Sequence, residues 1–334
     1  MDQGEGMTTR QKRLLVAVVT TLIMLVPVVI AELYLRHLGA GDPIIYYTNN
    51  TYRYAPLPNQ RRQRLNGAWT TIDGHGLRTP EPWNQDVDNR ILFVGNSITW
   101  SGTSIDDKAT FPYLTCVDLE KRTGLAFTCG NAGVSAYGTD NMAARIRFKT
   151  FDNEQAIVVT LIYPDMLRGL TELQRNYFFS STPQGPLPAL WEVGTILMFR
   201  LSYWLRHHSL VHYGDDGRGF LKAVIKDDLT VAEESLRNLL GILKAKEKEG
   251  KAVLVVLSPL KEELGGKESA FTRLAERLVL EYRLPSINMN GPVTEHYTEA
   301  TFSDDRHLGL EAHQLYATRI ADKLSVRFTH HSIK

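Results

Sequence analysis

The chain has 334 residues, more than one ordinary domain and fewer than three, so one large domain or a domain with appendages is expected. Hydrophobic residues make up 43% and charged residues 22%, a globular composition that excludes disorder throughout. Lys and Arg total 38 against 37 acids, a net charge of +1 that leaves no large electrostatic footprint for nucleic acid. Two cysteines exclude a disulfide-dense scaffold and a four-cysteine metal cluster.

The N-terminal segment contains a long apolar run. Residues 14–31 carry no charge, and such a stretch approaches the roughly 20 residues that cross a bilayer as a helix. Pro27 is acceptable there as a kink. A cleaved signal peptide is the alternative, but the run is longer than an ordinary signal-peptide core and no clear small-x-small site follows it. We therefore predict a transmembrane anchor at residues 14–36.

The flanking charges favour a cytoplasmic segment at residues 1–13. Three basic residues lie between positions 10 and 13, whereas Arg36 and Arg53 follow the run. This bias predicts a single-pass protein of the cytoplasmic (inner) membrane whose main domain lies on the extracytoplasmic, periplasmic side. Cys116 and Cys129 fit that oxidising compartment. Either they form a disulfide worth about 3 kcal/mol, or they are two free buried thiols.

Residues 37–88 are rich in Pro, Asn, Arg and Tyr, and we expect an extended arm that lies against a domain. After it, apolar runs at residues 91–94, 125–129, 156–163 and 252–257, with a short fifth at 286–289, are separated by helical patterns such as 111–123. Continuous apolar strands of this kind predict a parallel sheet covered on both faces. The fold class is therefore α/β, doubly wound, with its crevice at the carboxyl ends of the strands.

An insertion at about residues 170–235 interrupts the α/β pattern. Residues 187–210 within it predict an aromatic-rich amphipathic helix. This helix either covers the core or forms a lid or a face that contacts a membrane. The domain itself is expected to cover residues 89–328.

Two distant segments carry residues suited to nucleophilic chemistry. Ser97 follows the first strand and a glycine, on the turn that begins the next helix, where its hydroxyl would be exposed. Near the other end of the chain, Asp304 lies three residues before His307. A serine needs a base to remove its proton, and a histidine oriented by a carboxylate supplies it. Each segment alone also fits an ordinary turn or helix cap.

The two segments meet if the parallel domain returns both to one edge of the sheet. Asn131, Ala132 and Gly133 follow the second strand, where the glycine N–H can approach an oxyanion without side-chain obstruction. Asp304, His307 and His313 could in principle bind zinc, but no fourth ligand has motif spacing, so neither a metal nor a cofactor is predicted.

The order Gly-x-Ser, Asn-Ala-Gly and Asp-x-x-His before a closing helix resembles the SGNH (GDSL-type) hydrolase superfamily over about residues 89–325. The arm segment from Asp73 to Arg78 resembles the lead-in of membrane-anchored, extracytoplasmic members. The resemblance implies a three-layer α/β/α sandwich with a flavodoxin-like parallel sheet. It also implies Ser97 as nucleophile, Asp304 and His307 as its partners, and the N–H groups of Ser97 and Gly133 as the oxyanion hole.

Two positions depart from that family's pattern. Asn96 stands where the first block has Asp, and we expect modest damage. Pro164 stands where the third block has Asn, and proline donates no hydrogen bond. Loss of one oxyanion donor costs about 10²–10³ in rate. Tyr163, Arg168 or an insertion residue would have to substitute, or the enzyme is slow.

The sequence thus predicts a membrane-tethered serine esterase or O-acyltransferase that acts on short-chain, acetyl esters of envelope or carbohydrate substrates. The substrate class and the acetyl preference are implied by the resemblance. A catalytically degenerate domain that binds an envelope glycan or protein is the alternative, and a lipase that uses the aromatic insertion at the membrane is a third possibility.

Overall fold

The computed structural model describes residues 7–83, 87–148, 151, 153–171, 188–207, 229–304 and 306–331. It divides into two compact units. The first comprises residues 1–43 and 184–212, and the second comprises residues 44–183 and 213–334. The predicted insertion at residues 170–235 therefore falls partly in each unit, and much of it lies outside the described residues.

The described part of the first unit forms two helices, α1 (Thr9–His37) and α6 (Ala189–His207). Helix α1 has 29 residues, contains Pro27, buries none of its residues and has a mean hydropathy of 2.9 over its most apolar window. It is a candidate membrane span by length and composition. Helix α6 lies where the aromatic-rich sequence predicted a helix.

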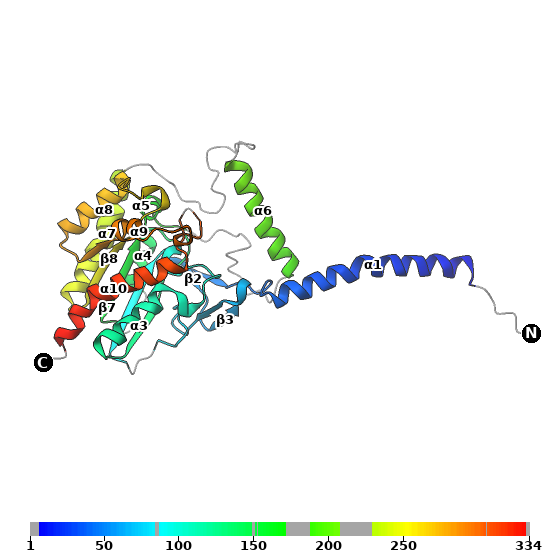
Figure 1. The fold of residues 1–334 in the computed structure, drawn as a ribbon, viewed down its shortest axis with the longest axis horizontal. Helices are drawn as coiled ribbons and strands as arrows, with labels where there is room; N and C mark the ends of the chain where they lie inside the picture. The colour runs from blue at the N-terminus through cyan, green and yellow to red at the C-terminus, as the bar shows by residue number, and fades with distance from the viewer. Residues whose placement is uncertain are drawn as a thin grey trace, which may run out of the picture. The chain divides into compact units, whose positions relative to one another are not determined.

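A five-stranded parallel sheet forms the centre of the second unit (Figure 1). Its strands are β5 (Asn89–Gly95), β6 (Phe127–Asn131), β7 (Ala156–Leu161), β8 (Ala252–Leu257) and β9 (Ser286–Asn288), in the order β6-β5-β7-β8-β9. This is the flavodoxin-like order, in which the first strand of the sheet pairs with the second and third. The predicted α/β fold class is confirmed, and no strand end differs from its predicted position by more than two residues.

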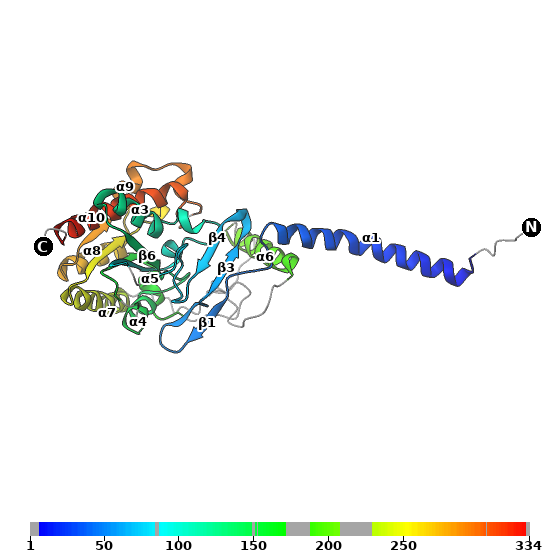
Figure 2. The ribbon, with the colours of Figure 1, turned by 90° about the horizontal axis from the view of Figure 1, so that it is seen from below.

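Helices cover both faces of this sheet because both faces of each central strand are apolar. Seen in Figure 2, α3 (Phe111–Thr123), α9 (Asn290–Glu295) and α10 (Leu310–His331) lie on one side, whereas α4 (Thr139–Phe148) and α7 (Leu229–Lys248) lie on the other. Helix α8 (Ala270–Glu281) packs into the same core as α4 and α7. Alternate strand residues divide accordingly: Leu92 and Val94 belong to one core, and Ile91 and Phe93 to the other.

Residues 37–88 contain regular structure that the sequence analysis missed. Four short strands form two antiparallel hairpins: β1 (Tyr46–Asn49) with β2 (Arg53–Pro56), and β3 (Gln60–Gln63) with β4 (Trp69–Ile72). Each strand has only four residues, too few for a period-two pattern to stand out. The extended arm predicted from the sequence thus contains two short hairpins. The arm does lie against the sheet, since Arg78 pairs with Asn131 at the end of β6.

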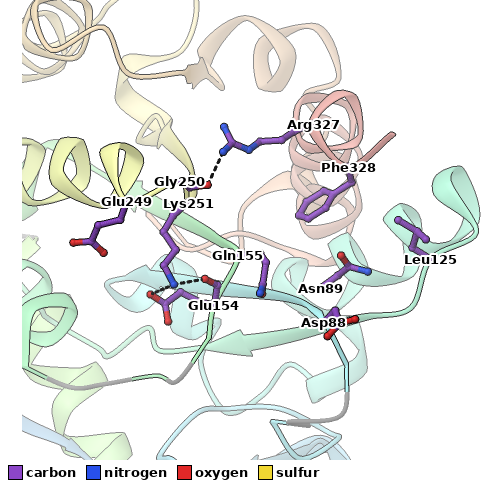
Figure 3. A pocket seen from close by; sticks show the side chains of 10 residues that line it. All are labelled: Asp88, Asn89, Leu125, Glu154, Gln155, Glu249, Gly250, Lys251, Arg327 and Phe328. Atoms are coloured by element: carbon purple, nitrogen blue, oxygen red, sulfur yellow. Dashed lines mark hydrogen bonds and ion pairs between the residues drawn. The ribbon is translucent and has the colours of Figure 1, made fainter. Parts of the chain in front are cut away.

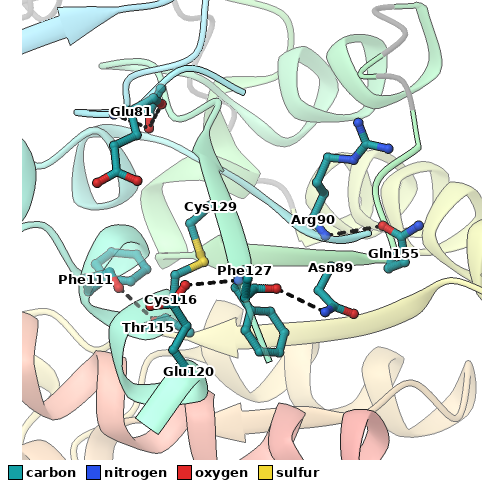
Figure 4. The surroundings of a disulfide bond; sticks show 12 residues. Glu81, Asn89, Arg90, Phe111, Thr115, Cys116, Glu120, Phe127, Cys129 and Gln155 are labelled. Atoms are coloured by element: carbon teal, nitrogen blue, oxygen red, sulfur yellow. Dashed lines mark hydrogen bonds between the residues drawn. A yellow bond between two sulfur atoms is a disulfide. The ribbon is translucent and has the colours of Figure 1, made fainter. Parts of the chain in front are cut away.

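Cys116 and Cys129 form a disulfide (Figure 4). The bond joins the middle of α3 to β6 and closes a sequence separation of 13 residues. Of the two states that the sequence left open, the structure has the bonded one. It fastens the helical layer that contains α3 directly to the edge strand of the sheet.

Candidate active site

The candidate site lies at the carboxyl edge of the parallel sheet. Ser97 begins the short helix α2 (Ser97–Trp100) immediately after β5. Asp304 and His307 lie in the loop between the 3-10 helix Glu299–Thr301 and α10. Because β5 ends at this edge and the last loop returns to it, residues more than 200 positions apart in the chain become neighbours.

Ser97, His307 and Asp304 form one hydrogen-bonded series. The Ser97 Oγ lies 2.9 Å from His307 Nε2, and His307 Nδ1 lies 2.7 Å from Asp304 Oδ2. With the proton on Nδ1 donated to the carboxylate, Nε2 is left to accept the serine proton. A general base must lie within about 2.6–3.2 Å of the proton donor that it serves, and both contacts meet that requirement.

Asp304 is held in place by the backbone of its own loop. Its Oδ1 accepts the N–H groups of Arg306 and His307, each at 2.8 Å. Partial burial alone would raise the pKa of Asp304, but the hydrogen bonds and charge of His307 and these backbone donors lower it to about 2. The carboxylate therefore stays ionised at neutral pH, as a residue that orients and stabilises an imidazolium must. The side chains of His307 and Asp304 are 41% and 55% exposed, so substrate can reach them.

The region around the predicted oxyanion donor Gly133 is tightly packed. A Cβ at Gly133 would lie 2.6 Å from the backbone N of Trp100 and 2.8 Å from the carbonyl carbon of Thr99, so the position requires glycine. The side chain of Asn131 bridges this turn to α2, since its Nδ2 donates to Thr99 O at 2.6 Å and its Oδ1 accepts the Gly133 N–H at 2.8 Å. The Gly133 N–H is therefore engaged, and it can serve an oxyanion only by leaving or sharing that bond.

Tyr163 and Arg168, the two residues named as substitutes for the third-block donor, both bind other side chains. Pro164 lies in the first turn of α5 (Tyr163–Arg168). The Tyr163 hydroxyl donates to Glu262 Oε1 at 2.6 Å, and Arg168 Nη1 donates to Asp165 Oδ1 at 3.0 Å. The insertion residues that could have served lie largely outside the described residues.

Asn96, which departs from the family's pattern, binds a residue that the sequence did not reveal. Asn96 is fully buried, and its Nδ2 donates to both carboxylate oxygens of Asp165, at 2.6 and 2.8 Å. Its Oδ1 accepts the Ile98 N–H at 2.7 Å and so caps α2 beside the nucleophile. Burial raises the pKa of Asp165 to about 6, although Arg168 and these hydrogen bonds oppose the rise. An amide at position 96 thus donates hydrogen bonds to both oxygens of a buried carboxylate.

Arg78 of the arm holds the chain that follows α2. Its guanidinium is buried, forms an ion pair with Asp107 at 2.8 Å, and donates to the carbonyl oxygens of Trp100, Gly102 and Ile105. Burial raises the pKa of Asp107, although Arg78 opposes the rise. In the sequence, Arg78 stands out only as part of a lead-in motif. A buried arginine near three carbonyl groups could not be inferred from spacing alone.

His313 does not join the site. It is fully buried, and its Nδ1 accepts the Phe111 N–H at 3.2 Å. Burial and, to a smaller extent, the positive charge of Arg78 lower its pKa to about 3, so the ring is neutral. Within the described ranges no group of three or more His, Cys, Asp or Glu side chains is arranged to hold a metal ion.

A cavity of about 490 Å³ lies at the opposite, amino edge of the sheet (Figure 3). It is lined by the residues that precede or begin the strands, among them Asn89, Gln155 and Lys251. Lys251 is paired with Glu154 at 3.4 Å, and Arg327 donates to Gly250 O. These two cationic side chains are paired within the protein, and Ser97 is not among the residues that line the cavity.

The fold and the hydrogen-bonded series define a class: an α/β/α protein with the arrangement of a serine hydrolase. No family model and no curated protein matches the chain. Among solved structures it is similar to a two-domain esterase active on acetylated mannans, with 17% identity over 71% of this chain and 50% of that chain and a TM-score of 0.43. A lipase/acylhydrolase from Enterococcus faecalis matches with 13% identity over 72% and 96% of the two chains and a TM-score of 0.43. An acetyl xylan esterase matches with 11% identity over 70% and 99% and a TM-score of 0.42.

Proposed function

We propose that the protein is a membrane-tethered serine esterase or O-acyltransferase that acts on short-chain, acetyl esters of envelope or carbohydrate substrates. The observation that carries the proposal is the unbroken contact series from Ser97 Oγ through His307 to Asp304, at 2.9 and 2.7 Å. The family resemblance of the same three residues supports the ester bond as the target and the acetyl group as the acyl chain.

In the proposed reaction, Ser97 Oγ attacks the acyl carbon while His307 Nε2 takes the hydroxyl proton. Asp304 stabilises the resulting imidazolium, and the carbonyl oxygen becomes an oxyanion. His307 then returns the proton to the leaving alcohol as the carbon–oxygen bond breaks, which leaves an acyl-Ser97 ester. A water molecule or an acceptor hydroxyl gives its proton to His307 and attacks the acyl carbon. The bond between this carbon and Ser97 Oγ then breaks, His307 returns the proton to Ser97, and the acid or the new ester leaves.

The oxyanion would be held by backbone donors. Ser97 occupies the first position of α2, where helical N–H groups have no partner within the helix. The Gly133 N–H is the second donor and would exchange its bond to Asn131 Oδ1 for one to the oxyanion. With Pro164 in place of a third donor, we expect a rate about 10²–10³ below that of an enzyme with three donors.

The location follows from α1. A span at residues 14–36 with residues 1–13 in the cytoplasm would place the site on the extracytoplasmic side of the inner membrane, where ester-bearing envelope polymers lie. The disulfide supports this side, since such bonds persist in oxidising compartments and are rare in the cytoplasm.

The direct test is covalent labelling of the purified full-length protein with a fluorophosphonate probe. We expect labelling that is lost in Ser97→Ala and in His307→Ala, because the first lacks the nucleophile and the second the base. Ser101→Ala is the matched control: it removes a hydroxyl four residues away that only donates to carbonyl groups of its own turn. Labelling that persists in Ser97→Ala would refute the assignment.

A binding protein without turnover is the second candidate. It is favoured by Pro164, which donates nothing, and by the engaged Gly133 N–H. This candidate predicts that the folded protein is not labelled yet still retains an acetylated envelope glycan on a column. Labelling above the Ser97→Ala background excludes it.

A series of nitrophenyl esters of increasing acyl length distinguishes the short-chain reading from a lipase. We expect a maximum of kcat/KM at acetate. An optimum at long acyl chains would contradict the acetyl proposal and favour the lipase.

A further inference from the structure

Helix α6 exposes a large apolar face. Trp191, Leu197, Met198 and Leu201 are 63, 59, 66 and 49% exposed, and Leu190 lies beside them. At 100° per residue these positions fall within an arc of about 120° on one side of the helix. An exposed apolar face of this size indicates a site of contact with a membrane or with another protein.

The first turn of α6 is bonded to the end of α1 and to the chain that follows it. The Glu32 carboxylate accepts the N–H groups of Ala189 and Leu190, at 2.9 and 3.0 Å, and so caps the N-terminus of α6. One turn later Glu192, which is 1% exposed, accepts the Gly41 N–H from the chain just beyond α1. These bonds attach α6 both to the last turns of α1 and to the segment that follows α1.

The level of this attachment follows from helix geometry. From Leu14 to Glu32, α1 rises about 27 Å at 1.5 Å per residue, close to the roughly 30 Å thickness of a bilayer's hydrocarbon core. If Leu14 lies at the inner boundary, Glu32 and its ion-pair partner Arg36 lie at the outer boundary, at the level of the lipid headgroups. The first turn of α6 then begins at that level.

We propose that α6 is a second membrane-contacting element, an interfacial helix whose face of Leu190, Trp191, Leu197, Met198 and Leu201 is buried in the outer boundary of the bilayer that α1 crosses. The occupant of this face is lipid, because the face continues from a membrane span to which α6 is bonded. Tryptophan is the side chain enriched at this depth, and an amphipathic helix lies in the plane of such an interface. This inference rests on the proposed anchoring by α1.

The test places a fluorescent label at single engineered cysteines of the full-length protein in phosphatidylcholine–phosphatidylglycerol vesicles. Met198→Cys reports on α6 and Val19→Cys on α1. Leu280→Cys is the matched control, since Leu280 is a helical apolar residue of the second unit and is 74% exposed. The two native cysteines are bonded to each other and do not react. Quenching by nitroxide on the lipid acyl chains is compared with quenching by aqueous iodide.

We expect the label at position 198 to be quenched severalfold more by the lipid nitroxide than the label at 280, and to lose most of its iodide quenching. Quenching at 198 equal to that at 280, with 19 quenched by lipid, overturns the inference and leaves the anchor standing. Shielding of 198 from both quenchers also overturns it, because protein would then cover the face. A label at 19 that is quenched only by iodide refutes the anchor and the inference with it. Fluorophosphonate labelling in the same vesicles reports separately on the proposed catalysis.

Discussion

Replacing Asn96 by aspartate tests whether the buried amide at this position is required by Asp165. The change puts a second carboxyl group where the amide nitrogen now lies 2.6 and 2.8 Å from the two Asp165 oxygens. Two carboxylates at that distance in a buried site cannot both ionise, so the pair must hold one proton. One carboxyl oxygen of the new residue can still cap Ile98, and the variant should therefore fold at low pH.

The size of the effect follows from proton linkage. Asp165 of the unmodified protein has a raised pKa of about 6, so above that pH it is ionised in the fold. Its own contribution to stability is full below pH 3.8 and falls as the pH rises through about 6. The Asn96→Asp variant keeps a proton above pH 6 that the unfolded chain has lost. It should therefore lose about 1.4 kcal/mol of stability per pH unit relative to the unmodified protein, or about 2 kcal/mol between pH 6.5 and 8.

Chemical denaturation of both proteins at matched pH values between 5 and 8.5 measures this difference. The control is the double variant Asn96→Asp/Asp165→Asn, which exchanges carboxyl and amide and should remove most of the extra pH dependence. If the stability difference between Asn96→Asp and the unmodified protein does not change with pH, the inferred role of the amide is wrong.

Asp304→Asn should lower kcat on nitrophenyl acetate by up to about 10⁴-fold while the protein remains folded, because the amide stabilises the wrong tautomer of the base. Gly133→Ala should abolish turnover, since its Cβ would overlap backbone atoms of α2. Gly241 lies within α7, and a Cβ added there would meet no other atom within 4 Å. Gly241→Ala should therefore stabilise the protein by up to about 1 kcal/mol in thermal unfolding. Reducing the Cys116–Cys129 bond should lower the free energy of unfolding by about 3 kcal/mol in urea titrations.

Each of these outcomes can fail in a definite way. Full activity in Asp304→Asn would mean that the carboxylate does not orient the base. Retained turnover in Gly133→Ala would show that the turn can shift away from α2. Equal unfolding free energies with and without reductant would mean that the disulfide adds no stability beyond that of the packed core.

The central sheet could be predicted because its strands are buried on both faces and therefore appear as unbroken apolar runs. The convergence of Ser97 with Asp304 and His307 also followed from topology, since parallel strands deliver their carboxyl ends to one edge. The hairpins of residues 46–72 could not be predicted, because strands of four residues leave no clear period and their stability comes from packing against the rest of the unit.

The polar pairings of the site were hidden for a different reason. Asn96 and Asp165 are 69 residues apart, and Arg78 reaches its partners across a turn that no local pattern describes. A sequence shows that Asn96 departs from a motif, but only three-dimensional proximity shows which group the departure serves.

The contacts of Arg78 have a practical consequence for dissecting the protein. A fragment cut to start at residue 89 would keep every strand of the sheet and all three residues of the contact series. It would nevertheless remove the only described side chain that ties together the carbonyl groups of Trp100, Gly102 and Ile105, and it would leave Asp107 buried without its cation. A fragment that retains these contacts of the nucleophile loop therefore has to begin before Arg78.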